Sequence, residues 1–271
     1  MSNGNDLFNN LKSLGFDNLS EVDLYKAETK QTEIKSVSRT SPADFLFDRK
    51  IECPCCGKQT TVRAVKSSGV RVISRDTDFM TYYQDPNPML YDAWVCIFCG
   101  YAALSSKFSV ISDRQIRLIK ENITSKWTSS KKYPAVYDID TAIEMHQLAL
   151  LNCVVKMGKD SEKAYTCLKI AWLYRLKKDD ANEFKFLLQA QKGFVLTLEK
   201  EVFPVVGLDE ESMEYLIGEL FRRLDSDSEA LKWFSRVLCN PKAKAKIKDM
   251  ARDQRDLINK LRSMDQGKYI V

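Results

Sequence analysis

The residues best suited to chemistry are four cysteines in two C-x-x-C motifs, each followed at once by glycine: Cys53-Pro54-Cys55-Cys56-Gly57 and Cys96-Ile97-Phe98-Cys99-Gly100. Two thiolates separated by two residues reach one metal ion only where the chain folds back tightly, and glycine supplies the positive φ that such a turn uses. A single C-x-x-C also fits a thioredoxin-type redox motif. Two copies, each flanked by strand-like sequence, instead predict one tetrahedral metal site.

The predicted ligands are Cys53, Cys56, Cys96 and Cys99. Four thiolates favour Zn²⁺ in a structural role, and iron stays open because the two motifs also look like those of rubredoxin. A four-cysteine site is closed, since every coordination position is taken by the protein and none is left for water or substrate. Such a site is expected to hold a fold together rather than to catalyse a reaction.

The other thiols and the single histidine offer less. Cys55 is a fifth thiol that could exchange with a ligand and make the site a redox sensor, but any C-P-x-C motif has some residue there, so we favour a bystander. His146 follows the apolar stripe of a predicted helix and is interpreted as a core residue. The chain has one histidine and no phosphate-binding glycine motif, so its sequence offers few residues for a catalytic triad or a nucleotide site.

A polar and aromatic insert separates the two cysteine motifs. The 39 residues from 57 to 95 exceed the spacing of a simple zinc ribbon, so an elaborated ribbon is predicted. The insert supplies a possible recognition surface beside the metal, made of Arg75, Asp76, Asp78, Tyr83, Asn87 and Tyr91. The alternative, which we favour, is that the aromatic rings cover a small core while Asp and Asn cap turns around the prolines.

Strand-like segments are expected to position both motifs. Residues 45–47 lead into the first motif and residues 91–95 into the second. Residues 60–65 and 70–75 are two β-prone runs joined by Lys66-Ser67-Ser68-Gly69, which is a plausible hairpin connection. Further on, Ser112-Asp113-Arg114-Gln115 is predicted to cap a helix that runs through about Trp127.

Beyond about Asp138 the apolar residues recur at helical spacing, and short joints predict antiparallel neighbours. One pair fits the tetratricopeptide (TPR) pattern of small residues at a close helix crossing, large residues in the gaps and a proline after the second helix: Gly218, Phe221, Ala230, Phe234 and Pro241. The predicted class is α+β, with a small four-cysteine zinc-ribbon-like β domain followed by an all-α TPR-like domain. The predicted segments are a flexible N-terminal arm (1–40), the β domain (41–111), a connecting helix and linker (112–137) and the helical domain (138–271).

Composition places the chain among ordinary globular proteins. It has 271 residues, 44% of them hydrophobic and 29% charged, with a formal net charge of +5. That charge is too small to imply nucleic-acid binding by the chain as a whole. No secretory signal or membrane-spanning apolar run is visible, and eight cysteines suit a reducing compartment, so a cytoplasmic location is expected.

Several motifs together resemble an uncharacterised bacterial family, domain of unknown function 2225. The resemblance runs from about Lys50 to Leu261 and includes both cysteine motifs, Arg75-Asp76-Thr77-Asp78-Phe79, Asn87-Pro88, Ala171-Trp172-Leu173-Tyr174-Arg175 and Ala251-Arg252-Asp253-Gln254. It implies a zinc-ribbon-like module joined to a TPR-like helical module, and it implies no activity.

Three functions are compatible with these features. The preferred hypothesis is a zinc-binding scaffold whose helical array binds a protein or peptide partner. The alternative is a regulatory protein that binds nucleic acid through a basic, aromatic face of the ribbon, with Tyr82, Tyr83 and Trp94 near several arginines and lysines. An enzyme is the least favoured, since Asp76 and Asp78 with Arg75 form its only candidate cluster and their spacing defines no reaction.

Overall fold

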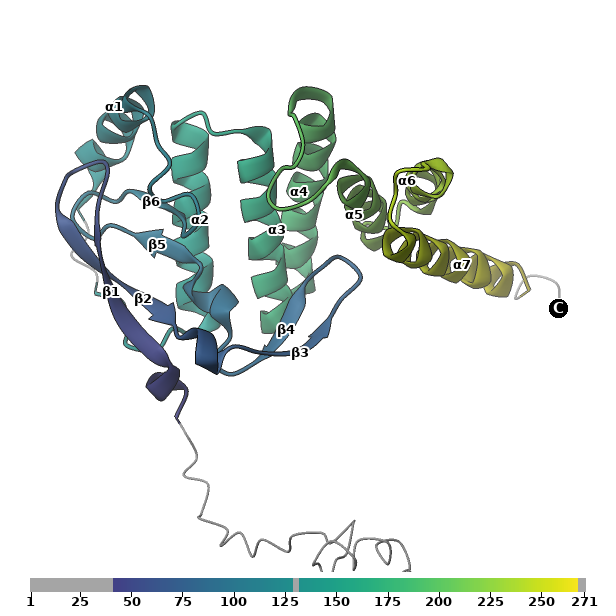
Figure 1. Cartoon of the computed structure of the whole chain (residues 1–271), viewed down its shortest axis with the longest axis horizontal. Coiled ribbons are helices and arrows are strands. Elements are labelled where there is room, and N and C mark those ends of the chain that lie inside the picture. Colours follow the sequence, from purple (N-terminus) through teal and green to yellow (C-terminus); the bar gives the residue numbers. More distant parts are fainter. Residues whose placement is uncertain (1–40, 129–131, 268–271) are drawn as a thin grey trace, which may run out of the picture. The chain divides into compact units, whose positions relative to one another are not determined.

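The computed structural model of this chain describes residues 41–128 and 132–267. The predicted N-terminal arm, residues 1–40, lies outside the described residues. A β region with short antiparallel strands comes first, and helices follow it (Figure 1). The predicted α+β class is therefore confirmed.

The two cysteine motifs are the turns of two separate hairpins. Strand β1 (Leu46–Glu52) pairs with β2 (Gln59–Val65), and Glu52 lies opposite Gln59 across the first motif. Strand β5 (Ala93–Val95) pairs with β6 (Ala102–Leu104) across the second motif. Because each motif closes its own hairpin, the strands on either side fix where the sulfur atoms point.

The predicted hairpin between residues 60–65 and 70–75 is wrong. β2 takes β1 as its partner because the first cysteine motif is itself the tight turn: the Cys53 backbone N–H donates to the Lys58 carbonyl over 3.0 Å. Ser67–Gly69 form a short 3₁₀ turn between different sheets, and β3 (Arg71–Arg75) pairs instead with β4 (Thr81–Gln84). Residues 76–80, which we call the carboxylate turn, close that hairpin through a 2.7 Å bond from Asp76 N–H to the Met80 carbonyl.

The first helix begins where its capping residues predict. In α1 (Asp113–Asn122), the Ser112 hydroxyl accepts from the Gln115 N–H and the Gln115 side chain accepts from the Ser112 N–H. The helix ends at Asn122, before the predicted end at Trp127. A 3₁₀ turn (Thr124–Lys126) follows, and it directs the chain back toward the second cysteine motif.

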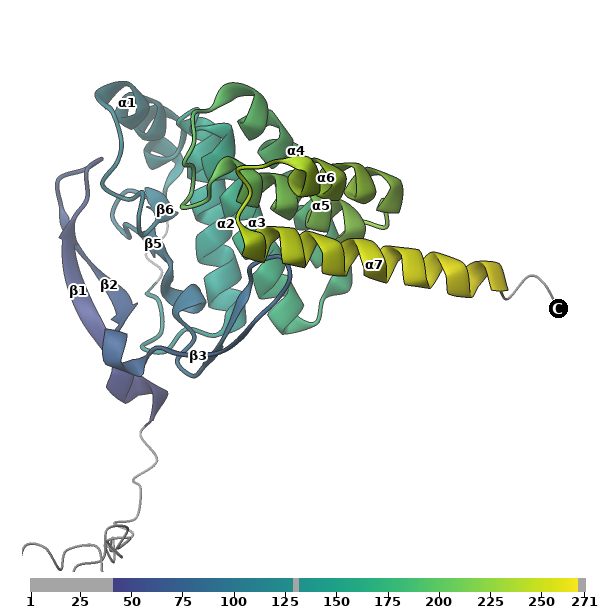
Figure 2. The same ribbon diagram turned by 45° about the vertical axis from the view of Figure 1, so that its right-hand side comes forward.

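The helical half comprises α2 (Ile139–Val155), α3 (Asp160–Lys177), α4 (Asp180–Lys200), α5 (Glu210–Arg223), α6 (Asp227–Cys239) and α7 (Ala245–Gly267). Helix α2 packs against β5 and β6, while α3 pairs with α4 and α5 with α6 (Figures 1 and 2). At Gly218 of α5 an added Cβ would lie 2.8 Å from the Phe234 ring of α6, so only glycine allows this close crossing.

The β region and the helices share more than one hydrophobic cluster. Met80 and Met89, which flank β4, are buried with Leu168, Leu173 and Phe194 of the helices. The hairpins are thus fixed against the helical half by apolar packing as well as by the sequence that connects them. Among the helices of the described residues, none is long and apolar enough to cross a membrane.

Candidate metal centre

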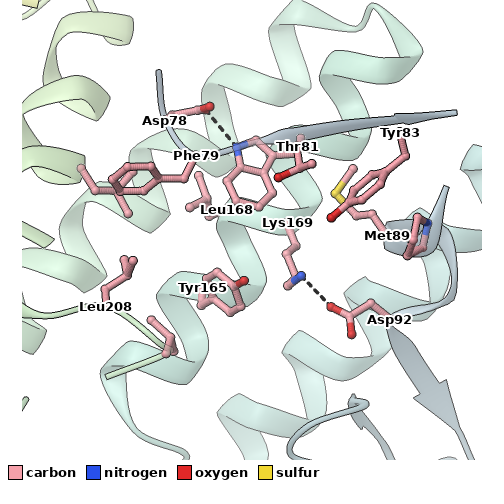
Figure 3. Close-up of a pocket in the computed structure, with 14 residues that line it drawn as sticks. Asp78, Phe79, Thr81, Tyr83, Met89, Asp92, Tyr165, Leu168, Lys169 and Leu208 are labelled. Atoms are coloured by element: carbon pink, nitrogen blue, oxygen red, sulfur yellow. Dashed lines mark hydrogen bonds and ion pairs between the residues drawn. The ribbon is translucent and has the colours of Figure 1, made fainter. Parts of the chain in front are cut away.

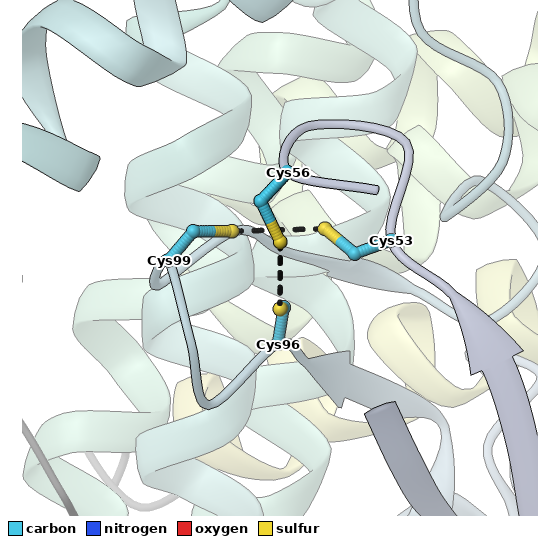
Figure 4. A group of neighbouring side chains, drawn as sticks. All are labelled: Cys53, Cys56, Cys96 and Cys99. Carbon is cyan, nitrogen blue, oxygen red and sulfur yellow. Dashed lines mark hydrogen bonds between the residues drawn. The ribbon is translucent and has the colours of Figure 1, made fainter. Parts of the chain in front are cut away.

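The four predicted ligands lie together although two of them are 40 or more residues from the others. The Sγ atoms of Cys53, Cys56, Cys96 and Cys99 all lie within 4.8 Å of one another. Two of the separations are 3.6 Å (Cys53 to Cys99) and 3.7 Å (Cys56 to Cys96), as Figure 4 shows. Four sulfur atoms about 2.3 Å from one Zn²⁺ would lie about 3.8 Å apart in a tetrahedron. The four-sulfur cluster therefore fits one tetrahedral metal ion, and its four cysteines are free thiols rather than disulfides.

Both turns follow one geometry. The Gly57 N–H donates to the Cys53 carbonyl over 2.8 Å, and the Gly100 N–H donates to the Cys96 carbonyl over 2.9 Å. The two glycines have φ of +70° and +73°, a region that residues with a Cβ rarely occupy. Glycine at these positions thus lets each turn bring its two thiols to the same side.

Helical residues hold the second turn in place. The Thr124 hydroxyl donates to the Cys99 carbonyl (3.0 Å), and the Trp127 indole donates to the Ile97 carbonyl (2.9 Å). From α2, the Asn152 amide donates to the Gly100 carbonyl over 3.1 Å. These three bonds satisfy backbone carbonyls of the turn, and the bond from Asn152 connects it to the helical half.

The cluster is largely buried. Cys53, Cys96 and Cys99 are buried and Cys56 is partly buried. Hydrogen bonds from other thiols, that of Cys55 first, lower the pKa of Cys53, and hydrogen bonds with Cys53 raise the pKa of Cys96 and Cys99. Cys55 itself is buried beside Cys53 but lies outside the four-sulfur cluster. A metal bound here has four protein ligands, which fits a structural role for either Zn²⁺ or iron.

The possible recognition residues Asp76 and Asp78 face the helices. One Nη of Arg175 on α3 donates to Asp76 over 2.9 Å, and the other donates to Asp78 over 2.7 Å. The Trp172 indole also donates to Asp78 over 2.9 Å, and Asp78 is fully buried. These bonds place the carboxylate turn against α3.

A second arginine holds the same turn from α5. The Arg223 guanidinium donates to Asp76 over 2.6 Å and to the Thr77 hydroxyl over 2.9 Å, while the Tyr215 hydroxyl donates to the Thr77 carbonyl. Burial opposes ionisation of Asp76, but Arg223, the Thr77 N–H and Arg175 together lower its pKa. The turn is thus an ionic clamp between hairpin and helices, and its carboxylates are occupied by internal donors.

The other four possible recognition residues lie in different surroundings. Arg75 is exposed on β3, and Tyr83 is half-buried at the edge of a cavity. Asn87 is buried and caps a 3₁₀ turn by accepting from the Met89 N–H. Tyr91 is buried and stacks on Tyr137, with ring centroids 4.8 Å apart. The six residues therefore do not share one exposed surface.

Sequence reasoning missed the partners of the carboxylate turn. Arg175 and Arg223 lie about a hundred or more residues from Asp76, and no local spacing connects them. A signal was nevertheless present, since Trp172 and Arg175 belong to the Ala171-Trp172-Leu173-Tyr174-Arg175 motif on which the family resemblance rests. His146 is fully buried, and its Nδ1 lies 2.7 Å from the Ala142 carbonyl, to which it donates when it carries the ring proton.

Comparison with known proteins identifies a family and no characterised relative. A family model described as an uncharacterized protein conserved in bacteria, DUF2225, matches residues 46–258. No curated protein and no solved structure matches significantly. The matched region covers most of the chain, including both cysteine motifs, the carboxylate turn and both of the arginines that hold it. The chain belongs to the bacterial family called domain of unknown function 2225.

Proposed function

We propose that this protein is a metal-stabilised scaffold that binds a protein or peptide partner. The observation that carries the proposal is the closed four-sulfur cluster, which sits where the β hairpins meet helical residues and leaves no coordination position for a substrate. A metal in such a site stabilises the fold around it. A stable fold that contains paired helices is suited to binding a protein or peptide partner. A cytoplasmic location is part of the proposal, since the eight cysteines are free thiols.

Two close helix crossings support the TPR-like part of the proposal. Gly218 meets Phe234 between α5 and α6, and an added Cβ at Gly193 of α4 would lie 2.7 Å from the Ala164 Cβ of α3. Small residues at such crossings are typical of helical repeats. The carboxylate turn contacts α3 and α5, the first helix of each pair, and the Phe79 ring lies against the Tyr215 ring of α5, with centroids 5.5 Å apart. The carboxylate turn therefore covers part of the surface of α3 and α5. A partner that binds these helices would bind beside the turn.

The residues that were candidates for catalysis are engaged in internal contacts. Asp76 and Asp78 are paired with Arg175 and Arg223, and the four thiols of the cluster converge on one another. Burial lowers the pKa of His146 to about 4, which removes its charge and its access to a substrate. No described nucleophile lies within hydrogen-bonding distance of this histidine.

Capture from the native bacterium tests the scaffold proposal. The tagged wild-type chain, Cys55→Ser and Cys99→Ser are purified in parallel, and co-purifying proteins are identified and titrated back as pure components. We expect one partner to bind the wild type and Cys55→Ser and to be lost from Cys99→Ser, because only the last breaks the four-sulfur cluster. Equal recovery with all three variants, or a metal-loaded chain that binds none of the recovered proteins when purified, would contradict the proposal.

One observation keeps nucleic acid as the second candidate. Phe98, at the tip of the second cysteine motif, is 48% exposed, and the Lys58 ammonium lies 5.1 Å from its ring centroid. An exposed ring beside a cation can stack on a base and contact phosphate. Trp94, by contrast, is covered by Arg49, and Tyr82 packs against the helical core. Fluorescence anisotropy with labelled RNA and single-stranded DNA decides this: salt-sensitive binding that Phe98→Ala abolishes would establish it, and flat curves at low salt would remove it.

A further inference from the structure

Two neighbouring cavities form a cleft along one face of α3. The first, of about 320 Å³, is lined by Trp172, Lys169 and Tyr165 of α3 and by Thr81 and Tyr83 of β4 (Figure 3). The second, of about 460 Å³, is lined by Glu162 and Tyr165 of α3 and by Lys107. Tyr165 and Val206 line both cavities, so the two adjoin at these side chains.

The length of the cleft suits an extended chain. Its α3 residues run from Glu162 to Trp172, and the ten steps between them span about 15 Å of helix axis. An extended peptide advances about 3.3 Å per residue, so about five residues would follow the cleft from end to end. A compact small molecule would fill one cavity and leave the other empty.

The first cavity offers an apolar anchor site with a few polar groups. Trp172, Tyr165 and Leu168 form apolar walls. The Thr81 and Tyr83 hydroxyls face the space, and within the described residues neither has a hydrogen-bond partner. Aromatic walls with unpaired hydroxyls suit a large apolar side chain whose flanking peptide groups donate and accept hydrogen bonds.

The charges of the cleft favour a peptide with an acidic residue. Lys169 lies 2.6 Å from Asp92, Glu162 lies 2.6 Å from Lys156, and Asp78 is held by Arg175. Burial opposes the charge of Lys169, but Asp92 raises its pKa and keeps it an ammonium. Among the described residues that line the cleft, Lys107 is the charged side chain without a partner. The uncompensated charge of the cleft is therefore positive and lies in the second cavity.

We infer that this cleft binds an extended peptide, with an apolar side chain in the first cavity and a carboxylate opposite Lys107. The inference rests on the proposed scaffold function and names the surface and the class of partner. Asp78 and Phe79 of the carboxylate turn line the first cavity, so the peptide binds against that turn and leaves it in place.

Selection from a random peptide library displayed on phage tests the inference with the metal-loaded full chain. We expect the enriched sequences to combine a large apolar residue with Asp or Glu a few residues away. The tightest peptide should lose at least about tenfold in affinity for Thr81→Trp, which fills the first cavity, and for Lys107→Glu. Replacing the peptide's acidic residue by lysine should restore binding to Lys107→Glu. Lys246→Glu on α7, an exposed lysine far along the chain, is the matched control and should change nothing.

The outcomes distinguish a failure of the cleft inference from a failure of the scaffold proposal. Peptides that bind wild type, Thr81→Trp and Lys107→Glu equally would contradict the cleft inference. The proposal of a peptide-binding scaffold would remain. A library that yields no binder would also contradict the cleft inference. The scaffold proposal would then be tested by partner capture from the native cell alone. A small molecule that co-purifies and is displaced by Thr81→Trp would assign the first cavity to a different class of ligand.

Discussion

Cys55 and Cys99 are both buried thiols next to the same site, but only Cys99 belongs to the four-sulfur cluster. Replacing Cys99 by serine should release the metal, because three thiolates and a hydroxyl bind Zn²⁺ far more weakly than four thiolates. Replacing Cys55 by serine should leave one metal per chain. Elemental analysis of the two purified variants and the wild type measures this difference.

Each result has a distinct reading. Equal metal in all three proteins would show that the ligands are misassigned, whereas loss from Cys55→Ser as well would make Cys55 essential for metal binding. Cys53→Ser serves as a second ligand variant from the other hairpin and should behave as Cys99→Ser does.

His146 should make stability depend on pH. Burial lowers its pKa from 6.5 to about 4 in the folded chain, against the opposing effect of Asp92, so the unfolded chain binds a proton that the folded chain does not. Stability contributed by the neutral histidine is therefore present above about pH 6.5 and lost as the pH falls toward 4. At about 1.4 kcal/mol per pH unit, the loss reaches about 3 kcal/mol.

Urea unfolding of the wild type and His146→Leu across this range measures the effect. Both proteins keep the same four cysteines, so metal release at low pH affects both. The difference between their slopes of unfolding free energy against pH is therefore the contribution of His146. Parallel pH profiles for the two proteins would mean that His146 titrates normally and is not buried.

At the scale of elements, the carboxylate turn joins the β3–β4 hairpin to α3 and α5. Asp78→Asn removes the charge that Arg175 and Trp172 contact inside the protein, and breaking a buried pair in this way should destabilise the chain by about 3–5 kcal/mol. Asp48→Asn is the matched control, because Asp48 pairs with Arg63 but is 62% exposed, and an exposed pair contributes less than about 1 kcal/mol.

Chemical denaturation of the two variants compares the buried and exposed pairs directly. A cost for Asp78→Asn no larger than that for Asp48→Asn would show that the turn merely rests on the helices and does not hold the hairpin to them.

The sequence was informative wherever a short motif decides the local structure. Ser112 and Gln115 predicted the start of α1, the glycines after each cysteine pair predicted the turns, and Gly218 with Phe234 marked two residues that prove to meet between α5 and α6. The alternation of residues 60–65 and 70–75 predicted strands but not their partners, because strand pairing depends on which turns connect the strands and not on propensity alone.

The partners of the insert could not be predicted for the same reason. The sequence offered Asp76 and Asp78 as part of a recognition surface or as turn caps, and only the fold brings Arg175 and Arg223 to them across about a hundred residues or more. The cleft along α3 was also invisible, since Lys107, Tyr83 and Tyr165 come from three separate elements.

At the scale of the whole molecule, the metal centre and the helices should unfold together. Asn152 of α2 and Trp127 hold the second cysteine motif, and α2 packs on β5 and β6. Removing the metal with a chelator should therefore lower the temperature at which the helical circular-dichroism signal is lost, by about 10 °C or more. Retention of the wild-type melting temperature in metal-free protein would contradict this coupling.

The account depends above all on four sulfur atoms binding one metal ion. X-ray absorption at the metal edge of the purified wild-type chain tests this most directly, combined with the metal content per chain. We predict one ion per chain with four sulfur neighbours at about 2.3 Å. A metal-free native protein, or a first shell that contains nitrogen or oxygen, would contradict the account.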